Sequence, residues 1–277
     1  MGKTFFTPAW GARTYLMGIV NVSPDSFSGD GIAGAQRALE IAHEMVEQGA
    51  DIIDVGGEST RPGSDPISES EEIARVLPVV QLLVTTLKVP ISVDTYKPGV
   101  AAAAIERGVT LLNDIWGLKE GADLAVLAAR HGASIVLMSN QRDVSPLHTV
   151  EFQDIVETVK DDLERATEAA LEIGVPREHI IVDPGIGFGK TQLQNLEILR
   201  RLREIRGLGF PMLVGTSRKS VLGHVLNLPA NERTEATAAT VALAIAEGAD
   251  IVRVHDVRQM WRVSKVTDAI VRGVPTP

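Results

Sequence analysis

Carboxylates, amides and cations follow short apolar runs throughout this sequence, and they are the residues that could do chemistry. The positions are Asn21, Asp94, Asn113, Asp183, Lys219, Arg253 and His255. Carboxylates and an amide suit a flat heterocycle with adjacent N–H donors, because one carboxylate can accept two such bonds at once. The cations suit an anionic group, and we expect them on the other side of the site. The amide oxygen of Asn21 could bind Mg²⁺, which needs few protein ligands when a substrate phosphate supplies the rest.

Each of these residues also has a plain structural explanation when it is taken singly. An Asp or Asn after a strand is often the N-cap of the next helix. Three glycines at 185, 187 and 189 could simply make tight turns, and Pro184 stands where a phosphate-binding P-loop needs a glycine. The six histidines show no metal-ligand spacing. The joint pattern favours a site, because the starts of the same apolar runs carry far fewer polar residues than their ends.

Eight apolar runs must position these residues. Each is continuous and rich in Val, Ile or Leu, which is typical of strands buried on both faces of a parallel sheet. We expect strands at 15–20, 51–55, 91–93, 110–112, 134–138, 179–182, 211–214 and 251–254. Amphipathic patterns lie between them, with a capping box of Ser68 and Glu71 at one helix start. The apolar stripe of the longest helix is Phe152, Ile155, Val156, Val159 and Leu163.

The alternation of eight strands with eight helices predicts an α/β fold, a single domain over residues 1–277 that forms a (β/α)8 TIM barrel. In such a barrel the active site lies at the C-terminal ends of the strands. A doubly wound open sheet is the alternative architecture. Five glycines that follow helical patterns should adopt left-handed C′ conformations. They are Gly49, Gly108, Gly132, Gly174 and Gly248.

Composition narrows the class of protein. A hydrophobic content of 44% is enough for a large core, and the net charge of −9 argues against a general nucleic-acid binder. The chain has no cysteine, which excludes disulfides, thiolate metal sites and cysteine nucleophiles. The first ten residues lack the apolar run of a secretory signal, and no apolar stretch is long enough to cross a membrane. We therefore expect a soluble cytoplasmic protein.

Over essentially its whole length the sequence resembles the dihydropteroate synthase family of pterin-binding enzymes. The motifs that carry the resemblance occur in order at 18–28, 56–63, 92–95, 113–115, 183–190, 217–220 and 253–256. The resemblance implies a transferase of folate biosynthesis that joins 6-hydroxymethyl-7,8-dihydropterin diphosphate to 4-aminobenzoate. It also implies dissociative chemistry, in which C–O cleavage releases diphosphate and the arylamine captures a pterin-methyl cation. Fixed electrostatics then matters more than a strong nucleophile.

The resemblance assigns a role to each matching position. The pterin ligands would be Asp94, Asn113, Met138, Asp183, Phe188, Lys219 and Arg253. The diphosphate would be held by Asn21, Arg253 and His255, with Mg²⁺ at Asn21 and the N-terminus of the last helix nearby. The aminobenzoate pocket would contain Phe27, Thr60, Arg61, Pro62, Lys219 and Ser220. The residues expected to be catalytic are Lys219, Arg253, Asp94 and Asp183.

Two departures from the family pattern are visible. The family often has Met-His after the fifth strand, whereas Ser139 follows Met138 here. Asp30 stands two residues after Ser28, where many relatives place the aspartate directly after the serine. The resemblance further implies a homodimer and competitive inhibition by sulfonamides. The alternatives are a methyltetrahydrofolate–corrinoid methyltransferase, which needs no diphosphate or arylamine site, and a non-catalytic pterin-binding paralogue.

Overall fold

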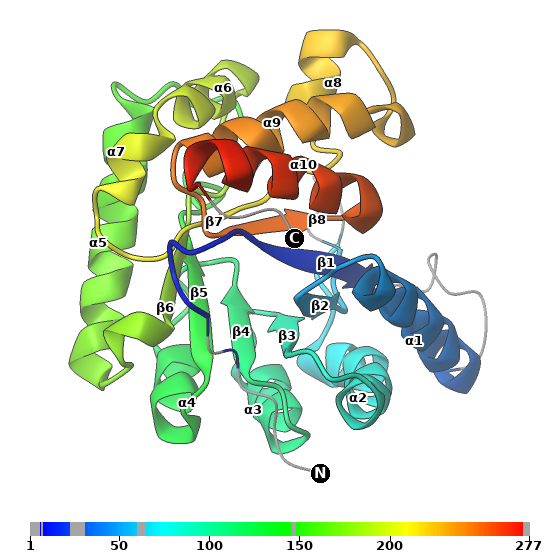
Figure 1. Ribbon diagram of the computed structural model, residues 1–277. Helices are drawn as coiled ribbons and strands as arrows, with labels where there is room; N and C mark the ends of the chain where they lie inside the picture. The colour runs from blue at the N-terminus through cyan, green and yellow to red at the C-terminus, as the bar shows by residue number, and fades with distance from the viewer. Residues whose placement is uncertain (1–5, 7, 23–30, 60–64, 146–147, 274–277) are drawn as a thin grey trace.

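Eight parallel strands form the centre of the molecule, and the helices surround them (Figure 1). The computed structural model describes residues 6, 8–22, 31–59, 65–145 and 148–273. The strands are β1 (Tyr15–Asn21), β2 (Ile52–Gly56), β3 (Ile91–Asp94), β4 (Leu111–Asp114), β5 (Ser134–Met138), β6 (Ile180–Asp183), β7 (Leu213–Val214) and β8 (Ile251–Val254). The predicted TIM barrel is confirmed, and the eight predicted runs agree with the observed strands to within two residues at either end.

The strand order around the barrel is β6-β5-β4-β3-β2-β1-β8-β7, so each strand lies beside its neighbour in sequence. Between β6 and β7 the barrel closes through one isolated parallel bridge, Val182 with Met212. The amide of Val182 also donates to the carbonyl of Pro211 across this gap, at 2.9 Å. Every other pair of neighbouring strands forms a ladder of at least two residue pairs, so this seam is the least hydrogen-bonded junction of the described barrel.

The described residues form ten α-helices and two short 3-10 helices, where the sequence predicted eight helices. The α-helices are α1 (Gly31–Glu47), α2 (Glu69–Thr86), α3 (Pro98–Glu106), α4 (Asp123–His131), α5 (Ile155–Ile173), α6 (Gln192–Arg200), α7 (Leu202–Arg206), α8 (Ser220–Leu226), α9 (Thr234–Ala246) and α10 (Val257–Val271). The prediction was wrong because two connections each contain two helices. Arg201 leaves the helical region between α6 and α7, and Asn227 ends α8 in a left-handed conformation.

Local signals at the helix ends were mostly interpreted correctly. The Ser68 hydroxyl accepts a hydrogen bond from the Glu71 amide at 3.2 Å, but the Glu71 carboxylate pairs with Arg75, so the capping box is not reciprocal. A reciprocal box occurs instead at Thr191 and Gln194, where none was predicted. All five glycines expected at C′ positions have positive φ angles. The four residues of the predicted stripe that lie in α5 are buried, whereas Phe152 precedes the helix and is only partly buried.

Two apolar regions hold the barrel together. The larger core lies between the outer face of the sheet and the helices. A smaller cluster inside the barrel includes Met17 and Leu111, and it is covered by Phe6, Trp10 and Tyr15, whose rings contact one another edge to face. Tyr15 begins β1, so these rings close the end of the barrel opposite the polar strand ends. Within the described part of the chain, no helix is both long and apolar enough to cross a membrane.

Candidate active site

The strand register brings the predicted polar residues to one level of the barrel. Asn21 is paired with Gly56, Gly56 with Asp94, and Asp94 with Asn113. Asp183 at the end of β6 is paired with Met138 of β5. Since every strand runs in the same direction, all these residues lie at the C-terminal mouth of the barrel, as expected for a site of this fold.

One guanidinium links two carboxylates at this mouth. Arg253 Nε donates to Asp54 Oδ2 at 2.6 Å, and its Nη2 donates to Asp94 Oδ2 at 2.7 Å. Asn113 Nδ2 donates to the same Asp54 oxygen at 3.1 Å. The expectation that the cations face the carboxylates from the other side is therefore wrong for Arg253. Its strand, β8, is separated from β2 only by β1, so the long side chain reaches the carboxylates directly.

Asp54 is the main residue of this group that the sequence did not single out. It is fully buried, and its second oxygen, Oδ1, has no hydrogen-bond partner among the described residues. The signal was present in the sequence, because Asp54 interrupts the apolar run of β2. A charged residue in the middle of a buried strand requires a partner of opposite charge.

A second group lies around Asp183 and Lys219. Asp183 is 6% exposed, and its Oδ1 accepts a hydrogen bond from the Gly185 amide at 2.7 Å. Lys219 Nζ donates to the carbonyl of Ile186 and lies 4.7 Å from the centre of the Phe188 ring. The guanidinium of Arg142, which the sequence did not single out, lies 4.5 Å from the same ring.

An apolar wall stands beside these charges. Met138 and Phe188, both predicted pterin contacts, pack with Ile115, and Tyr96 and Trp116 pack against the three. A flat ring bound here would have carboxylates and an amide at its edge and apolar side chains on its face. That combination provides both orientation and desolvation for a heterocycle.

A hydroxyl group, on Ser217, and an imidazole group, on His255, follow the seventh and eighth strands. Ser217 Oγ accepts a hydrogen bond from the backbone amide of His255 at 3.2 Å, and it lies 3.0 Å from His255 Nδ1. Arg218 pairs with Asp256 at 2.6 Å. Ser220 is exposed at the first residue of α8. Asn21 is exposed at the end of β1.

Burial shifts the pKa values of two acids and one lysine at the mouth of the barrel. It raises the pKa of Asp94 to about 7, against the opposing charge of Arg253 and with Asp54 adding to the rise. Burial also raises the pKa of Asp183, which the charge of Lys219 opposes. The pKa of Lys219 is lowered by burial to about 8, while Asp183 acts in the other direction. Such clustered shifts are typical of functional sites.

The pKa of Asp94 leads to a pH-dependent expectation. Protonation removes the charge of Asp94 and turns one of its acceptor oxygens into a donor, so affinity for the predicted pterin ligand should fall as pH drops through about 7. In an Asp94→Asn variant the affinity should be lower at every pH, and the dependence around pH 7 should flatten. Calorimetric titrations between about pH 5.5 and 8.5, which bracket that pKa, measure both profiles. An equally steep profile in the variant would assign the titration to another group.

Several predicted residues lie outside the described part of the chain. They are Phe27, Asp30, Thr60, Arg61 and Pro62. The described ranges therefore include the predicted pterin and diphosphate residues but leave out most of the predicted aminobenzoate pocket.

The fold and the site define a class of protein, a (β/α)8 barrel of the pterin-binding enzymes, and the family model described as "Pterin binding enzyme" matches residues 17–255. The dihydropteroate synthase of Clostridium beijerinckii is 48% identical over 264 residues, which is 95% of this chain and 96% of the relative. The chain belongs to the dihydropteroate synthase family.

Solved structures agree with this assignment. A dihydropteroate synthase from Clostridium difficile, crystallised in the presence of pteroic acid, is 48% identical and superimposes with a TM-score of 0.91. The match covers 96% of this chain and all of that one. The Yersinia pestis dihydropteroate synthase in a sulfonamide drug complex is 37% identical, with a TM-score of 0.87 and 94% of each chain covered.

Proposed function

We propose that the protein is a dihydropteroate synthase, a transferase that condenses 6-hydroxymethyl-7,8-dihydropterin diphosphate with 4-aminobenzoate to give 7,8-dihydropteroate and diphosphate. One observation carries the proposal: Asp94, Asn113, Asp183 and Lys219 converge beside the wall of Met138 and Phe188, in a chain 48% identical to enzymes of that name.

The pterin is proposed to bind with its edge toward the buried acids. Asp183 accepts from the ring N–H and amino groups, and Asn113 and Asp94 complete the polar edge. The charge of Lys219 beside Asp183 favours the ionised carboxylate against its burial. Arg253 is held by Asp54 and Asp94, so its guanidinium plane has a fixed position at the mouth of the barrel.

The diphosphate is proposed to bind beside Arg253 and His255, close to Ser217 and the N-terminus of α10. Amide groups in the first turn of a helix have no partner within it, so they attract an anion. In the dissociative reaction the C–O bond breaks as negative charge develops on the diphosphate and positive charge on the pterin-methyl group. Arg253, which Asp54 and Asp94 already hold in place, can stabilise the leaving group without reorganising.

Magnesium is proposed as the metal, with Asn21 as its protein ligand and diphosphate oxygens as the others. The donor set fits a hard cation. A Cβ placed on Gly56 would lie 3.7 Å from Asn21 Oδ1 and 3.7 Å from Asp94 Oδ2, so oxygen atoms flank a position that carries no side chain. When bound, magnesium would supply positive charge to the leaving diphosphate.

The arylamine is proposed to enter from the side of Lys219 and Ser220, where α8 begins. Phe27, Thr60, Arg61 and Pro62 are proposed to complete this pocket. Because the Yersinia pestis dihydropteroate synthase was solved in a sulfonamide drug complex, we propose that sulfonamides compete with 4-aminobenzoate here too. A large excess of sulfonamide that leaves the rate at low 4-aminobenzoate unchanged would contradict this.

Diphosphate release tests the function directly. The purified protein is mixed with the pterin diphosphate, with and without 4-aminobenzoate and Mg²⁺, and both products are measured. Formation of dihydropteroate that depends on both additions is the expected result. Tight pterin binding without diphosphate release would indicate a binding paralogue, and methyl transfer to a corrinoid protein would indicate the alternative enzyme.

A homodimer is proposed through the face formed by α9 and α10. These helices pack against each other and expose the apolar side chains of Leu243, Val266 and Ile270. The three are 59%, 62% and 78% exposed, which is unusual for large apolar residues unless another surface covers them. Mass measurement by light scattering should give twice the 29.7 kDa of one chain, and Ile270→Glu should reduce it to the monomer value.

A further inference from the structure

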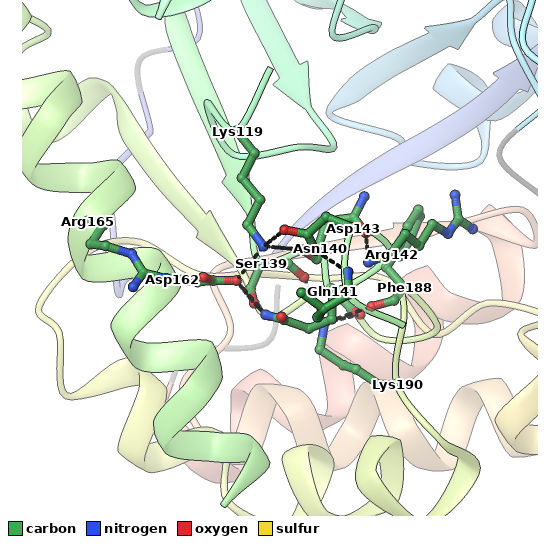
Figure 2. A network of polar contacts seen from close by, with 12 residues as sticks. Lys119, Ser139, Asn140, Gln141, Arg142, Asp143, Asp162, Arg165, Phe188 and Lys190 are labelled. Atoms are coloured by element: carbon green, nitrogen blue, oxygen red, sulfur yellow. Dashed lines mark hydrogen bonds and ion pairs between the residues drawn. The ribbon is translucent and has the colours of Figure 1, made fainter. Parts of the chain in front are cut away.

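Lys190 is the largest fully buried side chain among the described residues. It lies in the sixth loop, residues 184–191, which connects β6 to α6. Its Nζ donates to three backbone carbonyls, those of Ser139 at 2.7 Å, Gly185 at 3.0 Å and Phe188 at 3.1 Å (Figure 2).

These contacts use the full donor capacity of an ammonium group, which has three N–H bonds. Within the described ranges Lys190 forms no ion pair with a carboxylate. Burial lowers its pKa to about 7, although the charges of Asp183 and Asp162 oppose this. An apolar side chain of similar length would avoid the cost of burying a charge. The placement of Lys190 therefore indicates a role in fixing local geometry.

The three carbonyls belong to two loops that touch through their backbones. The Gln141 amide donates to the Phe188 carbonyl at 3.3 Å, which links the fifth loop, residues 139–145, to the sixth. A Cβ at Gly185 would clash with the Ser139 carbonyl, and a Cβ at Gly189 would clash with the backbone at Gln141. Both glycines have positive φ angles, so the sixth loop turns its carbonyls inward to the ammonium.

The fifth loop is held independently from its outer side. Asp162 of α5 accepts hydrogen bonds from Ser139 Oγ, at 3.1 Å, and from Gln141 Nε2. Lys119 donates to the carbonyl of Asn140 at 2.5 Å and lies 3.2 Å from Asp162 (Figure 2). With the fifth loop fixed to α5, Lys190 can fix the sixth loop against it.

The sixth loop in turn carries two parts of the pterin site. The Phe188 ring belongs to the apolar wall, and the Ile186 carbonyl accepts the hydrogen bond from Lys219. We propose that Lys190 is a positioning residue for the pterin subsite, which it serves by holding the sixth loop so that Phe188 and Lys219 meet the substrate. This inference rests on the proposed function. The Lys190 side chain itself would not touch the pterin, because backbone carbonyls use its three donors.

Lys190→Met tests the inference, because methionine keeps the apolar stem and removes all three donors. The Kd of 6-hydroxymethyl-7,8-dihydropterin diphosphate, measured by calorimetry without 4-aminobenzoate, should rise at least tenfold. The KM for 4-aminobenzoate at saturating pterin should rise by a smaller factor than the pterin Kd, because Lys219 belongs to both subsites whereas Phe188 belongs to the pterin subsite alone. Lys160→Met is a control for the loss of a lysine, because Lys160 pairs with Glu157 of the same helix, α5, at 2.8 Å and holds neither loop, so its pterin Kd should stay within threefold of wild type.

A rescue experiment separates positioning from folding. Lys190→Ala leaves room for n-propylammonium, which replaces the missing methylenes and ammonium, and this cation should restore pterin affinity whereas 1-propanol should not. Wild-type pterin affinity in Lys190→Met overturns the inference. So does failure of n-propylammonium to restore binding in a Lys190→Ala variant that melts cooperatively. If that variant does not fold, the pterin Kd of Lys190→Met decides. Absence of pterin binding in the wild type would instead overturn the proposed function.

Discussion

Replacing Asp183 by alanine should weaken binding of the pterin diphosphate by about 2–5 kcal/mol, the range for removing one partner of a buried hydrogen-bonded charge pair. This corresponds to a Kd raised by roughly 30-fold to several thousand-fold. Asp183 is buried near Lys219 and accepts from the Gly185 amide, so alanine removes both the acceptor of that amide and the negative charge that the Lys219 ammonium faces. Calorimetry with the pterin diphosphate alone measures the loss.

Asp183→Asn is the matched control. Its amide oxygen can still accept from Gly185, which preserves the turn into the sixth loop, but it carries no charge and accepts fewer hydrogen bonds. Its pterin affinity should fall between wild type and Asp183→Ala. Full affinity in the alanine variant would remove Asp183 from the pterin site.

Arg253→Met should lower the free energy of unfolding by about 3–5 kcal/mol, because it leaves the buried Asp54 and Asp94 without their shared cation. The loss should grow with pH. The pKa of Asp94 is already about 7, and a group with a raised folded-state pKa binds more protons folded than unfolded. Because Arg253 lowers this pKa, its loss raises the pKa of Asp94 further, so protonation relieves the unpaired charge at about pH 6 and that relief declines only as pH rises toward about 9. Urea unfolding at both pH values measures it.

Adding Asp54→Asn to Arg253→Met should recover part of the lost stability, since it removes one of the two unpaired charges. Arg203→Met is a control for loss of an arginine, because Arg203 is 75% exposed in its ion pair with Glu247 and should cost less than about 1 kcal/mol. Equal losses for Arg253→Met and Arg203→Met would mean that the Arg253 bridge adds nothing to stability. Turnover should be lost in Arg253→Met even where the variant remains folded.

Much of the fold could be predicted because the strands of a parallel barrel are continuous apolar runs. Glycines at 49, 108, 132, 174 and 248 marked helix ends correctly, since a left-handed C′ position selects glycine strongly. The extra helices were missed where short polar segments interrupt a connection. At Arg201 one non-helical residue divides a helical pattern in two, and sequence periodicity does not resolve a single-residue break.

The sequence predicted which residues form the site better than it predicted which of them contact one another. Asp94, Asn113, Asp183 and Lys219 were found because each follows an apolar run. The contact between Arg253 and Asp54 depends on how strands 199 residues apart lie around the barrel, which no local pattern contains. Lys190 was overlooked for the same reason, since a lysine in a glycine-rich loop gives no local sign of full burial.

The seam between β6 and β7 has a consequence for how ligand and barrel stabilise each other. Asp183 ends β6 and Lys219 follows β7, so a pterin bound to both spans the junction that the backbone closes with one bridge. Binding should therefore slow amide hydrogen exchange most at Val182 and its neighbours across the gap, and less at the β2–β3 junction, which is already fully laddered. We therefore expect a bound pterin to stabilise the barrel at the junction where the described strands share the fewest hydrogen bonds.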